Sequence, residues 1–464
     1  MKIAKLQIAA LSCAILFAML GGCNGGGGGD SSAPLLASQV VAGYYNTCAR
    51  LDSGQLKCWG NNDAGTLGLG DVQARGDQPG EMGNSLPAVD LGPGRSVSQV
   101  SIPGDHACAL LDGGEVKCWG QNGEGELGLG DTETRGDQSG EMGASLPAVD
   151  LGTGLTATQI GAGNSGFSCA LLDNGRVKCW GFNGNGELGL GDIQSRGNAP
   201  GEMGDLLPAV DLGDNPPTSG MKILVTQMAV GSRHTCVVLE TGQVKCWGAG
   251  GVLGLGDGTF RGFDPSQMGD NLPFVDLGPV RTATQIAAAN TFLSGHSCVI
   301  LDNGQLKCWG QNNNGQLGLG DTENRGDQVG EMGVNLPAVD LGTGLTASKV
   351  ALGAGHSCAL LNTGQVKCWG LNDLGQLGLG DNLARGDQPG EMGDNLPAVN
   401  LGAGRTAVDI AAGGSHSCAV LDTGRIKCWG NNSWGQLGLG DMNSRGDQAG
   451  EMGDALPAVD LGAR

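Results

Sequence analysis

The sequence predicts an all-β protein, a seven-bladed β-propeller built from seven tandem repeats of about 60 residues with one hairpin disulfide in each blade. Three observations support this prediction. The string Cys-Trp-Gly recurs seven times, at intervals of 60, 61, 67, 62, 60 and 60 residues. Each repeat contains short apolar runs between glycine-rich turns, and none shows a long helical period. A repeat of this length leaves one apolar face unburied, so neighbouring repeats complete the core.

The first 22 residues resemble a lipoprotein signal peptide. Two lysines precede a mostly apolar run from Ile8 to Leu20, which is too short for a stable transmembrane helix. The run ends in Leu20-Gly21-Gly22-Cys23, which resembles the bacterial lipoprotein cleavage box. Cys23 is therefore the predicted lipidation site and the first residue of the mature protein. The alternative is an ordinary signal peptide with an incidental cysteine.

Residues 23–38 form a predicted lipid-anchored tether rich in glycine and serine. A flexible segment of this length spans on the order of 20 Å. The propeller, predicted for residues 39–464, would then hang from a membrane by its acyl chains, which hold stably when there are several of them. Asn24 stands where an aspartate would resemble the inner-membrane retention signal, so we favour the outer membrane of a bacterial cell envelope.

The charge balance argues against several classes of partner. The chain has a net charge of −21, and its basic residues form no stripe. Such a surface repels DNA, RNA and anionic lipid, so we expect no nucleic-acid partner and no membrane contact apart from the lipid anchor. The 90 glycines fall at fixed repeat positions, which indicates tight turns between short strands.

Each repeat contains two cysteines ten residues apart. In the sixth copy, Asn362-Thr363-Gly364 separates two apolar runs and has the form of a three-residue hairpin loop. Folding about Thr363 places Cys358 opposite Cys368 at a non-hydrogen-bonded position, where side chains are closest. We therefore predict seven cross-strand disulfides, which pair Cys48 with Cys58, Cys108 with Cys118, Cys169 with Cys179, Cys236 with Cys246, Cys298 with Cys308, Cys358 with Cys368, and Cys418 with Cys428.

Zinc binding and free thiols are the alternatives for these cysteines. Zinc would require clustered cysteines or added histidines at ligand spacing, and only five of the seven repeats have a histidine near the first cysteine. A disulfide that closes a ten-residue loop contributes roughly 2–3 kcal/mol or less. The oxidising compartment that disulfides need agrees with the predicted export signal.

Within one repeat the sequence predicts four short strands. In the fifth copy these are residues 285–289, 296–301, 305–309 and 336–341, with a turn-rich stretch and a long loop before the last of them. Four short strands with glycine turns are typical of a propeller blade. The repeats lie at approximately 39–96, 97–157, 158–220, 221–283, 284–346, 347–406 and 407–464.

At these residues the chain resembles the regulator of chromosome condensation repeat family. The family pattern of His-Thr/Ser, an apolar strand, an Asp-Gly turn, Val-Tyr-x-Trp-Gly and Asn-x-x-Gly-Gln-Leu-Gly is found in all seven copies with small departures. The resemblance implies a seven-bladed β-propeller. Three features depart from the family: lysine replaces the tyrosine, the cysteine pair is added, and the Arg-Gly-Asp…Gly-Glu-Met-Gly loop is longer.

The resemblance also bears on function. The eukaryotic founder of the family exchanges nucleotide on a small nuclear GTPase and binds chromatin, which does not suit an exported, acidic, disulfide-bearing protein. Secreted bacterial members include inhibitors that bind enzymes with one face of the ring, and they are a closer analogy. No nucleophile, base and orienting residue stand out together, and the five histidines share one repeat position, so we expect structural histidines and no enzyme activity.

The Arg-Gly-Asp strings resemble an integrin adhesion motif. The arginine occurs in all seven repeats, and an aspartate always stands four residues before it, as Asp71 precedes Arg75. We interpret this as an internal ion pair that orders the loop. Acidic and amide groups crowd the loops, so calcium is the ligand that we consider, although no EF-hand spacing exists; we expect no other cofactor.

The repeat is least regular between its third and fifth copies. An insertion occupies residues 213–220, residues are lost after Trp247, and the segment 289–295 is expanded. Exposed aromatic side chains in loops are typical anchors of protein interfaces, whereas the alternative is that they fill gaps left by these changes. The predicted partner-binding residues are Phe167, Phe182, Phe260, Phe263, Phe274 and Phe292.

We therefore expect a monomeric, envelope-anchored propeller that binds a protein or another envelope component through its loops. The competing hypothesis is a structural envelope protein whose loops are stabilised by calcium. Guanine-nucleotide exchange is the function that we expect least.

Overall fold

The computed structural model describes residues 33–214, 220–290 and 295–464. Every described strand belongs to the second of its two units, Pro34–Arg464. The predicted lipidation site Cys23 and the candidate contact residue Phe292 both lie outside the described residues. In the described part of the chain, no helix is long and apolar enough to cross a membrane.

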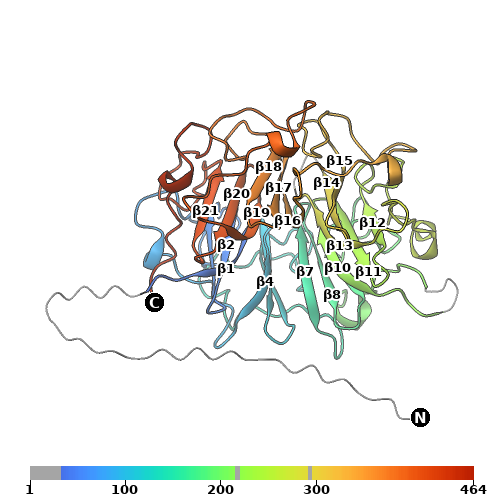
Figure 1. Cartoon of the computed structure of the whole chain (residues 1–464). Coiled ribbons are helices and arrows are strands. Elements are labelled where there is room, and N and C mark those ends of the chain that lie inside the picture. The colour runs from blue at the N-terminus through green and yellow to red at the C-terminus, as the bar shows by residue number, and fades with distance from the viewer. Residues whose placement is uncertain (1–32, 215–219, 291–294) are drawn as a thin grey trace, which may run out of the picture. The chain divides into compact units, whose positions relative to one another are not determined.

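The second unit consists of seven three-stranded antiparallel sheets, one for each repeat, which we call blades 1 to 7 in chain order (Figure 1). The first strands are β1 (Ala37–Ala42), β4 (Val97–Ser101), β7 (Ala157–Gly163), β10 (Val225–Val230), β13 (Ala283–Ala288), β16 (Ala347–Leu352) and β19 (Ala407–Ala412). They contact the first strands of neighbouring blades, which places them at the centre of the ring.

The second and third strands of each blade lie farther from the centre. The second strands are β2 (Asn46–Leu51), β5 (His106–Leu111), β8 (Phe167–Leu172), β11 (His234–Leu239), β14 (His296–Leu301), β17 (His356–Leu361) and β20 (His416–Leu421). The third strands are β3 (Leu56–Gly60), β6 (Val116–Gly120), β9 (Val177–Gly181), β12 (Val244–Gly248), β15 (Leu306–Gly310), β18 (Val366–Gly370) and β21 (Ile426–Gly430). Nearly all their residues are buried, because each sheet is covered on both faces by its neighbours.

Short 3-10 helices lie in the long loops after the third strands. They are η1 (Gly83–Ser85), η2 (Gly204–Leu206), η3 (Pro265–Gln267), η4 (Gly269–Asn271), η5 (Gly333–Asn335), η6 (Gly393–Asn395) and η7 (Gly453–Ala455).

The prediction of a fourth strand in each blade was wrong. The segment Leu336–Leu341 and its counterparts are extended but join the third strand by a single backbone hydrogen bond, such as Val339 N to Leu306 O at 2.8 Å. Each of these segments has a proline in second position, and a proline has no N–H to donate to a sheet. The leucine and valine side chains of the segment are nevertheless buried in the core.

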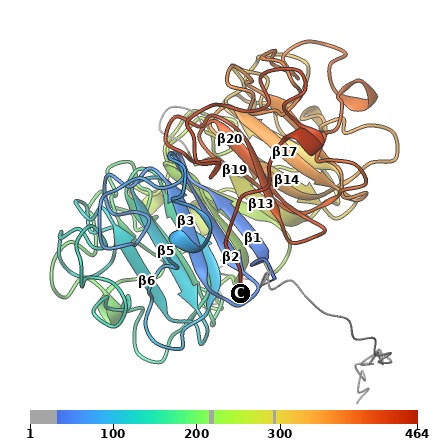
Figure 2. The ribbon, with the colours of Figure 1, turned by 90° about the vertical axis from the view of Figure 1, so that its left-hand side faces the viewer.

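Each apolar core lies between two neighbouring blades. At the junction of the last and first blades, Trp59 and Val40 pack with Val420 and Leu461 in one cluster. Six similar clusters occupy the other junctions. Figures 1 and 2 show β1 and β2, in blue, beside the C-terminal strands β19 and β20, in red, and contacts between these strands agree. The ring is therefore closed.

No blade combines strands from the two ends of the chain, yet the ends do pair. Leu35 N donates to Gly462 O at 2.9 Å, and Pro34 forms an isolated antiparallel bridge with Ala463. The polypeptide thus closes the ring with short terminal segments that flank complete blades.

Candidate partner-binding face

Two sets of loops leave the blades at the same end of the strands. One set joins the first strand to the second, and the other follows the third strand and carries the Arg-Gly-Asp and Glu-Met-Gly sequences. A backbone hydrogen bond from Asn61 N to Tyr45 O at 3.0 Å joins the two sets in blade 1. We call this end of the ring the loop face. The tight hairpin turns, such as that at Thr363, lie at the opposite end.

The seven predicted disulfides are confirmed. Each links directly opposed residues of the second and third strands, as Cys358 opposes Cys368, with Cα atoms 4.0–4.2 Å apart across the set. Their cysteines are buried and lie in the cores between blades.

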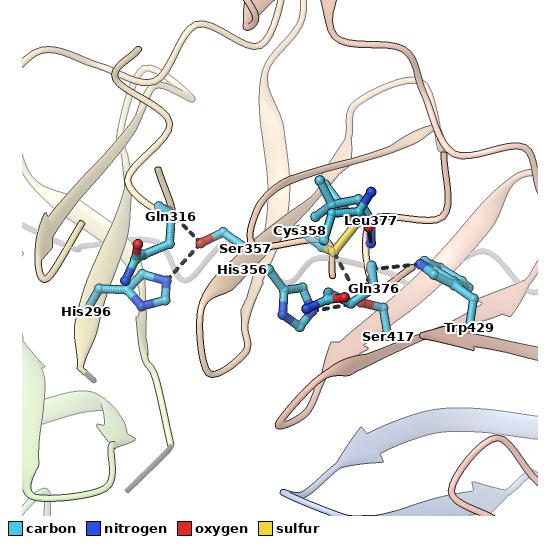
Figure 3. The surroundings of a disulfide bond; sticks show 11 residues. His296, Gln316, His356, Ser357, Cys358, Gln376, Leu377, Ser417 and Trp429 are labelled. Atoms are coloured by element: carbon cyan, nitrogen blue, oxygen red, sulfur yellow. Dashed lines mark hydrogen bonds between the residues drawn. A yellow bond between two sulfur atoms is a disulfide. The ribbon is translucent and has the colours of Figure 1, made fainter. Parts of the chain in front are cut away.

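The five histidines join each of their blades to the next. His356 Nε2 lies 2.9 Å from Ser417 Oγ, and the Ser417 hydroxyl donates to Gln376 O at 2.9 Å (Figure 3). Because that hydroxyl donates to a carbonyl, it accepts from the imidazole. Trp429 Nε1 donates to the same carbonyl at 3.0 Å. Burial lowers the pKa of the His356 imidazole to about 4, so it is neutral near pH 7.

Lysine takes part in the same framework. Lys367 Nζ donates to Gly393 O of its own blade at 2.8 Å and to Leu341 O of the preceding blade at 2.9 Å. Burial lowers the pKa of its ammonium group. The other six lysines of this position make the same pair of bonds. The lysines that replace the family tyrosine therefore connect neighbouring blades, a role that the sequence analysis did not assign to them.

The Arg-Gly-Asp loops are ordered by internal contacts. Arg75 Nη2 pairs with Asp71 Oδ2 at 2.7 Å, and the six equivalent pairs measure 2.6–2.9 Å. Glu81 Oε2 accepts from the backbone N–H groups of Gly76 and Gln78, both at 3.0 Å. The arginine thus pairs with an aspartate of its own loop, which confirms the predicted internal ion pair. An arginine held in this way is not free to bind an adhesion receptor.

The predicted contact phenylalanines differ in exposure. Phe260, Phe263 and Phe274 are 40%, 39% and 43% exposed. Phe182 is half-buried against its own loop. Phe167 occupies the histidine position of blade 3 and is fully buried, so the prediction that it contacts a partner was wrong. An aromatic ring at that position fills the space between blades.

Phe274 covers one of the framework lysines. Lys245 Nζ lies 4.8 Å from the centre of its ring, at a position where the other repeats have alanine. Beside it is a cavity of about 210 Å³, lined in part by Ile223, Leu239 and Asp270. Phe274 is therefore partly structural. Phe260 and Phe263, in contrast, flank Arg261, which keeps its ion pair to Asp257.

An aromatic cluster that we did not predict from the sequence lies where blade 7 meets blade 1. The Tyr45 and Trp434 ring centres are 6.2 Å apart, and Tyr44 packs edge-on against Tyr45 at 4.4 Å. We call these three residues the seam patch. Two signals pointed to them: they include both tyrosines of the chain and the one tryptophan outside the Cys-Trp-Gly strings.

The loop aspartates show one repeated feature. Oδ1 of the Arg-Gly-Asp aspartate is buried without a hydrogen-bond partner among the described residues in five blades, at Asp77, Asp137, Asp327, Asp387 and Asp447. Nowhere in the described ranges do three or more histidine, cysteine, aspartate or glutamate residues gather into a group suited to a metal ion. Any cation there would need backbone carbonyls as further ligands.

Comparison with known families agrees with this architecture. The Regulator of chromosome condensation (RCC1) repeat matches residues 37–66, 97–126, 157–187, 225–252, 347–376 and 407–436 in one form, and 303–360 and 363–420 in another. Blade repeats of this kind, closed into a ring, define a β-propeller. The chain belongs to the RCC1 repeat family.

Individual relatives cover most of the ring. The Ultraviolet-B receptor UVR8 of Arabidopsis thaliana is 31% identical over 413 residues, which cover 88% of this chain and 79% of the receptor. The mitochondrial RCC1 domain-containing protein RUG3 of the same plant is 28% identical over 341 residues, covering 70% and 68% of the two chains. The structure of yeast RCC1 (Prp20), solved with Kap60, superposes with a TM-score of 0.61 at 22% identity and covers 90% and 85% of the two chains.

Proposed function

We propose that this chain is a monomeric, non-enzymatic propeller that binds another protein through its loop face, and that a lipid on Cys23 anchors it to the outer membrane of a bacterial cell envelope. The proposal rests on one observation above all: Phe260 and Phe263 are exposed on a loop that keeps the ion pair between Asp257 and Arg261. Exposed aromatic residues on a rigid scaffold are common centres of protein interfaces.

The chemistry of the ring supports a binding role. The histidines, which would be the usual general bases, are buried, neutral and bonded to the next blade. The repeated arginines and lysines are likewise engaged in framework contacts. Yeast Prp20, which shares the fold, was crystallised with the protein Kap60, and we propose a protein partner here as well.

Affinity capture from envelope extracts tests the binding proposal. The full chain is compared with a variant that carries Phe260→Ser and Phe263→Asp, which are residues that sister repeats have at these positions. We expect one protein to be captured by the parent and lost with the variant, while both melt at the same temperature. Equal capture by the two proteins would contradict the proposal.

The anchoring proposal has its own test. Mass spectrometry of the mature N-terminus should find acylated Cys23, and Cys23→Ser should release the protein from the membrane fraction. An unmodified N-terminus at another residue would refute the anchor and leave the binding proposal standing.

Calcium-stabilised loops are the second candidate, favoured by the five unpartnered aspartate oxygens. Calcium should then raise the melting temperature of the parent. Asp387→Asn, which places the residue of blade 3 in blade 6, should reduce that rise because it removes a negative ligand. A melting temperature that does not respond to calcium would dismiss this candidate.

A further inference from the structure

The seam patch is solvent-accessible and lies on the loop face. Tyr45 is in the loop between β1 and β2, and Trp434 is in the loop after β21; they are 39% and 38% exposed. Residues from the two ends of the chain meet here because the ring closes between blades 7 and 1. Two large rings left in contact with water form an apolar surface that a partner could cover.

The fold does not require aromatic side chains at these positions. Asn61 N donates to Tyr45 O, and Trp434 N donates to Gln436 Oε1 at 2.9 Å, so both loops are held through backbone atoms. In blade 6, Leu374 N makes the same bond to Gln376 Oε1. The sister residues of Tyr45 are Asp105, Gly166, Arg233, Gly295, Gly355 and Ser415, and those of Trp434 include Ala64, Glu124, Asn185, Asn314 and Leu374.

Two carboxylates lie on loops that adjoin the patch. Tyr44 N donates to Pro103 O at 2.8 Å, two residues before Asp105, and Asp63 is in the loop after β3. Asn61, bonded through its N–H to Tyr45, donates from Nδ2 to Asp63 Oδ2 at 2.9 Å. Loss of hydration and the nearby charge of Asp63 raise the pKa of the Asp105 carboxyl. Within the described residues neither carboxylate forms an ion pair with a lysine or arginine.

We propose that the seam patch binds an arginine or lysine side chain presented by a basic segment of a partner protein, and that Asp63 and Asp105 on the adjoining loops bind further basic residues of that segment. A cation over the faces of tyrosine and tryptophan gains a cation–π attraction. The carboxylates supply charge-assisted hydrogen bonds to other basic residues of the same segment. The net charge of −21 favours approach of a basic segment. This site deepens the proposed binding function by naming the chemistry of one contact, and it does not involve Phe260 or Phe263.

The probe is a fluorescent nine-residue peptide that alternates arginine and serine, compared with the same peptide in which neutral citrulline replaces arginine. Binding to the full chain is followed by fluorescence anisotropy and by quenching of tryptophan. We expect the citrulline peptide to bind at least tenfold more weakly. Trp434→Asn should weaken arginine-peptide binding by at least about fivefold, which is the loss of one cation–π contact of roughly 1 kcal/mol.

Matched variants separate this site from general attraction to an acidic surface. Leu374→Asn makes the equivalent change in blade 6, and Asp373→Asn removes one charge there as Asp63→Asn does in blade 1. The proposal predicts weaker binding for the blade 7 and blade 1 variants alone. Equal affinity for both peptides, or equal losses in the matched variants, would overturn it. The peptide-binding result does not depend on whether the Phe260 and Phe263 variant loses capture from extracts. Either proposal can therefore fail while the other stands.

Discussion

Thr47 Oγ1 and His416 Nε2 lie 2.9 Å apart although the two residues are separated by 369 positions in the sequence. The Thr47 hydroxyl also donates to Gln436 O at 2.8 Å, as Ser417 donates to Gln376 O between blades 6 and 7. The junction that closes the ring therefore repeats the bonding of the internal junctions. Ring closure is achieved with the repeat's own framework contacts and a short pairing of Leu35 with Gly462.

Removal of residues 454–464 should destabilise the whole ring. Leu461 packs in the closing core and accepts a hydrogen bond from Lys57 Nζ at 2.9 Å, and Gly462 pairs with Leu35. The truncation also removes buried Val459 from that core. Loss of two such side chains should cost at least about 4 kcal/mol in the free energy of unfolding. Thermal melting, monitored by tryptophan fluorescence, measures this loss of stability.

A deletion of residues 25–29 in the tether is the control for that truncation. It should leave the melting temperature unchanged because these five glycines precede Pro34, the first residue of the propeller unit. If the C-terminal truncation and the tether deletion melt alike, closure through the terminal segments is refuted.

Lys367→Met should weaken the junction between blades 5 and 6. The change leaves Leu341 O and Gly393 O without the donor that they share, and an unsatisfied buried carbonyl costs roughly 1–3 kcal/mol. We expect the free energy of unfolding to fall by about 2 kcal/mol in denaturant titrations. Lys222→Met is the comparison: its ion pairs are exposed and should matter by less than about 1 kcal/mol. Similar losses for the two variants would refute the bridging role.

Acid should destabilise the ring through its histidines. Burial lowers the folded-state pKa to about 4 for His106, His234 and His356, and to about 3 for His296 and His416. Between pH 6.5 and 4 the unfolded chain therefore binds protons that the folded chain does not. As the pH is lowered through this window, the free energy of unfolding should decrease by up to about 1.4 kcal/mol per pH unit for each histidine.

Asparagine at this position provides the control, because Asn46 occupies it naturally in blade 1. His356→Asn should make the dependence of unfolding free energy on pH shallower across that window. An unchanged slope would show that the buried histidines are not responsible for acid sensitivity.

Two features repeated seven times were predictable from the sequence. The ten-residue cysteine spacing predicted the hairpin register, and the recurrent Asp71 and Arg75 positions predicted the loop ion pair, because a repeated pattern has one local geometry to satisfy. We overpredicted the fourth strand because the apolar spacing of the segment suits a strand. The proline in the segment cannot donate a hydrogen bond to a regular ladder. The buried Phe167 was misjudged because its surroundings come from the next blade.

Contacts between distant repeats could not be predicted in the same way. Trp434 and Tyr45 meet only because blade 7 packs on blade 1, and neither residue carries a sequence signal of that proximity. The same holds for Lys349 and Asp409, which form an ion pair on neighbouring first strands where several sister repeats have glutamine. The repeat pattern predicts contacts that all blades share. The role of a residue that departs from the pattern depends on contacts that form only in the assembled ring.

The most direct test of partner binding through the loop face is site-specific photo-crosslinking in envelope preparations. A photoreactive phenylalanine analogue is placed at Phe260, and at exposed Thr423 in a hairpin turn at the opposite end of the strands as the comparison. Binding through the loop face should give a discrete crosslinked protein from position 260 and none from position 423. Crosslinks from both positions, or from position 423 alone, would contradict the assignment of the loop face as the binding surface.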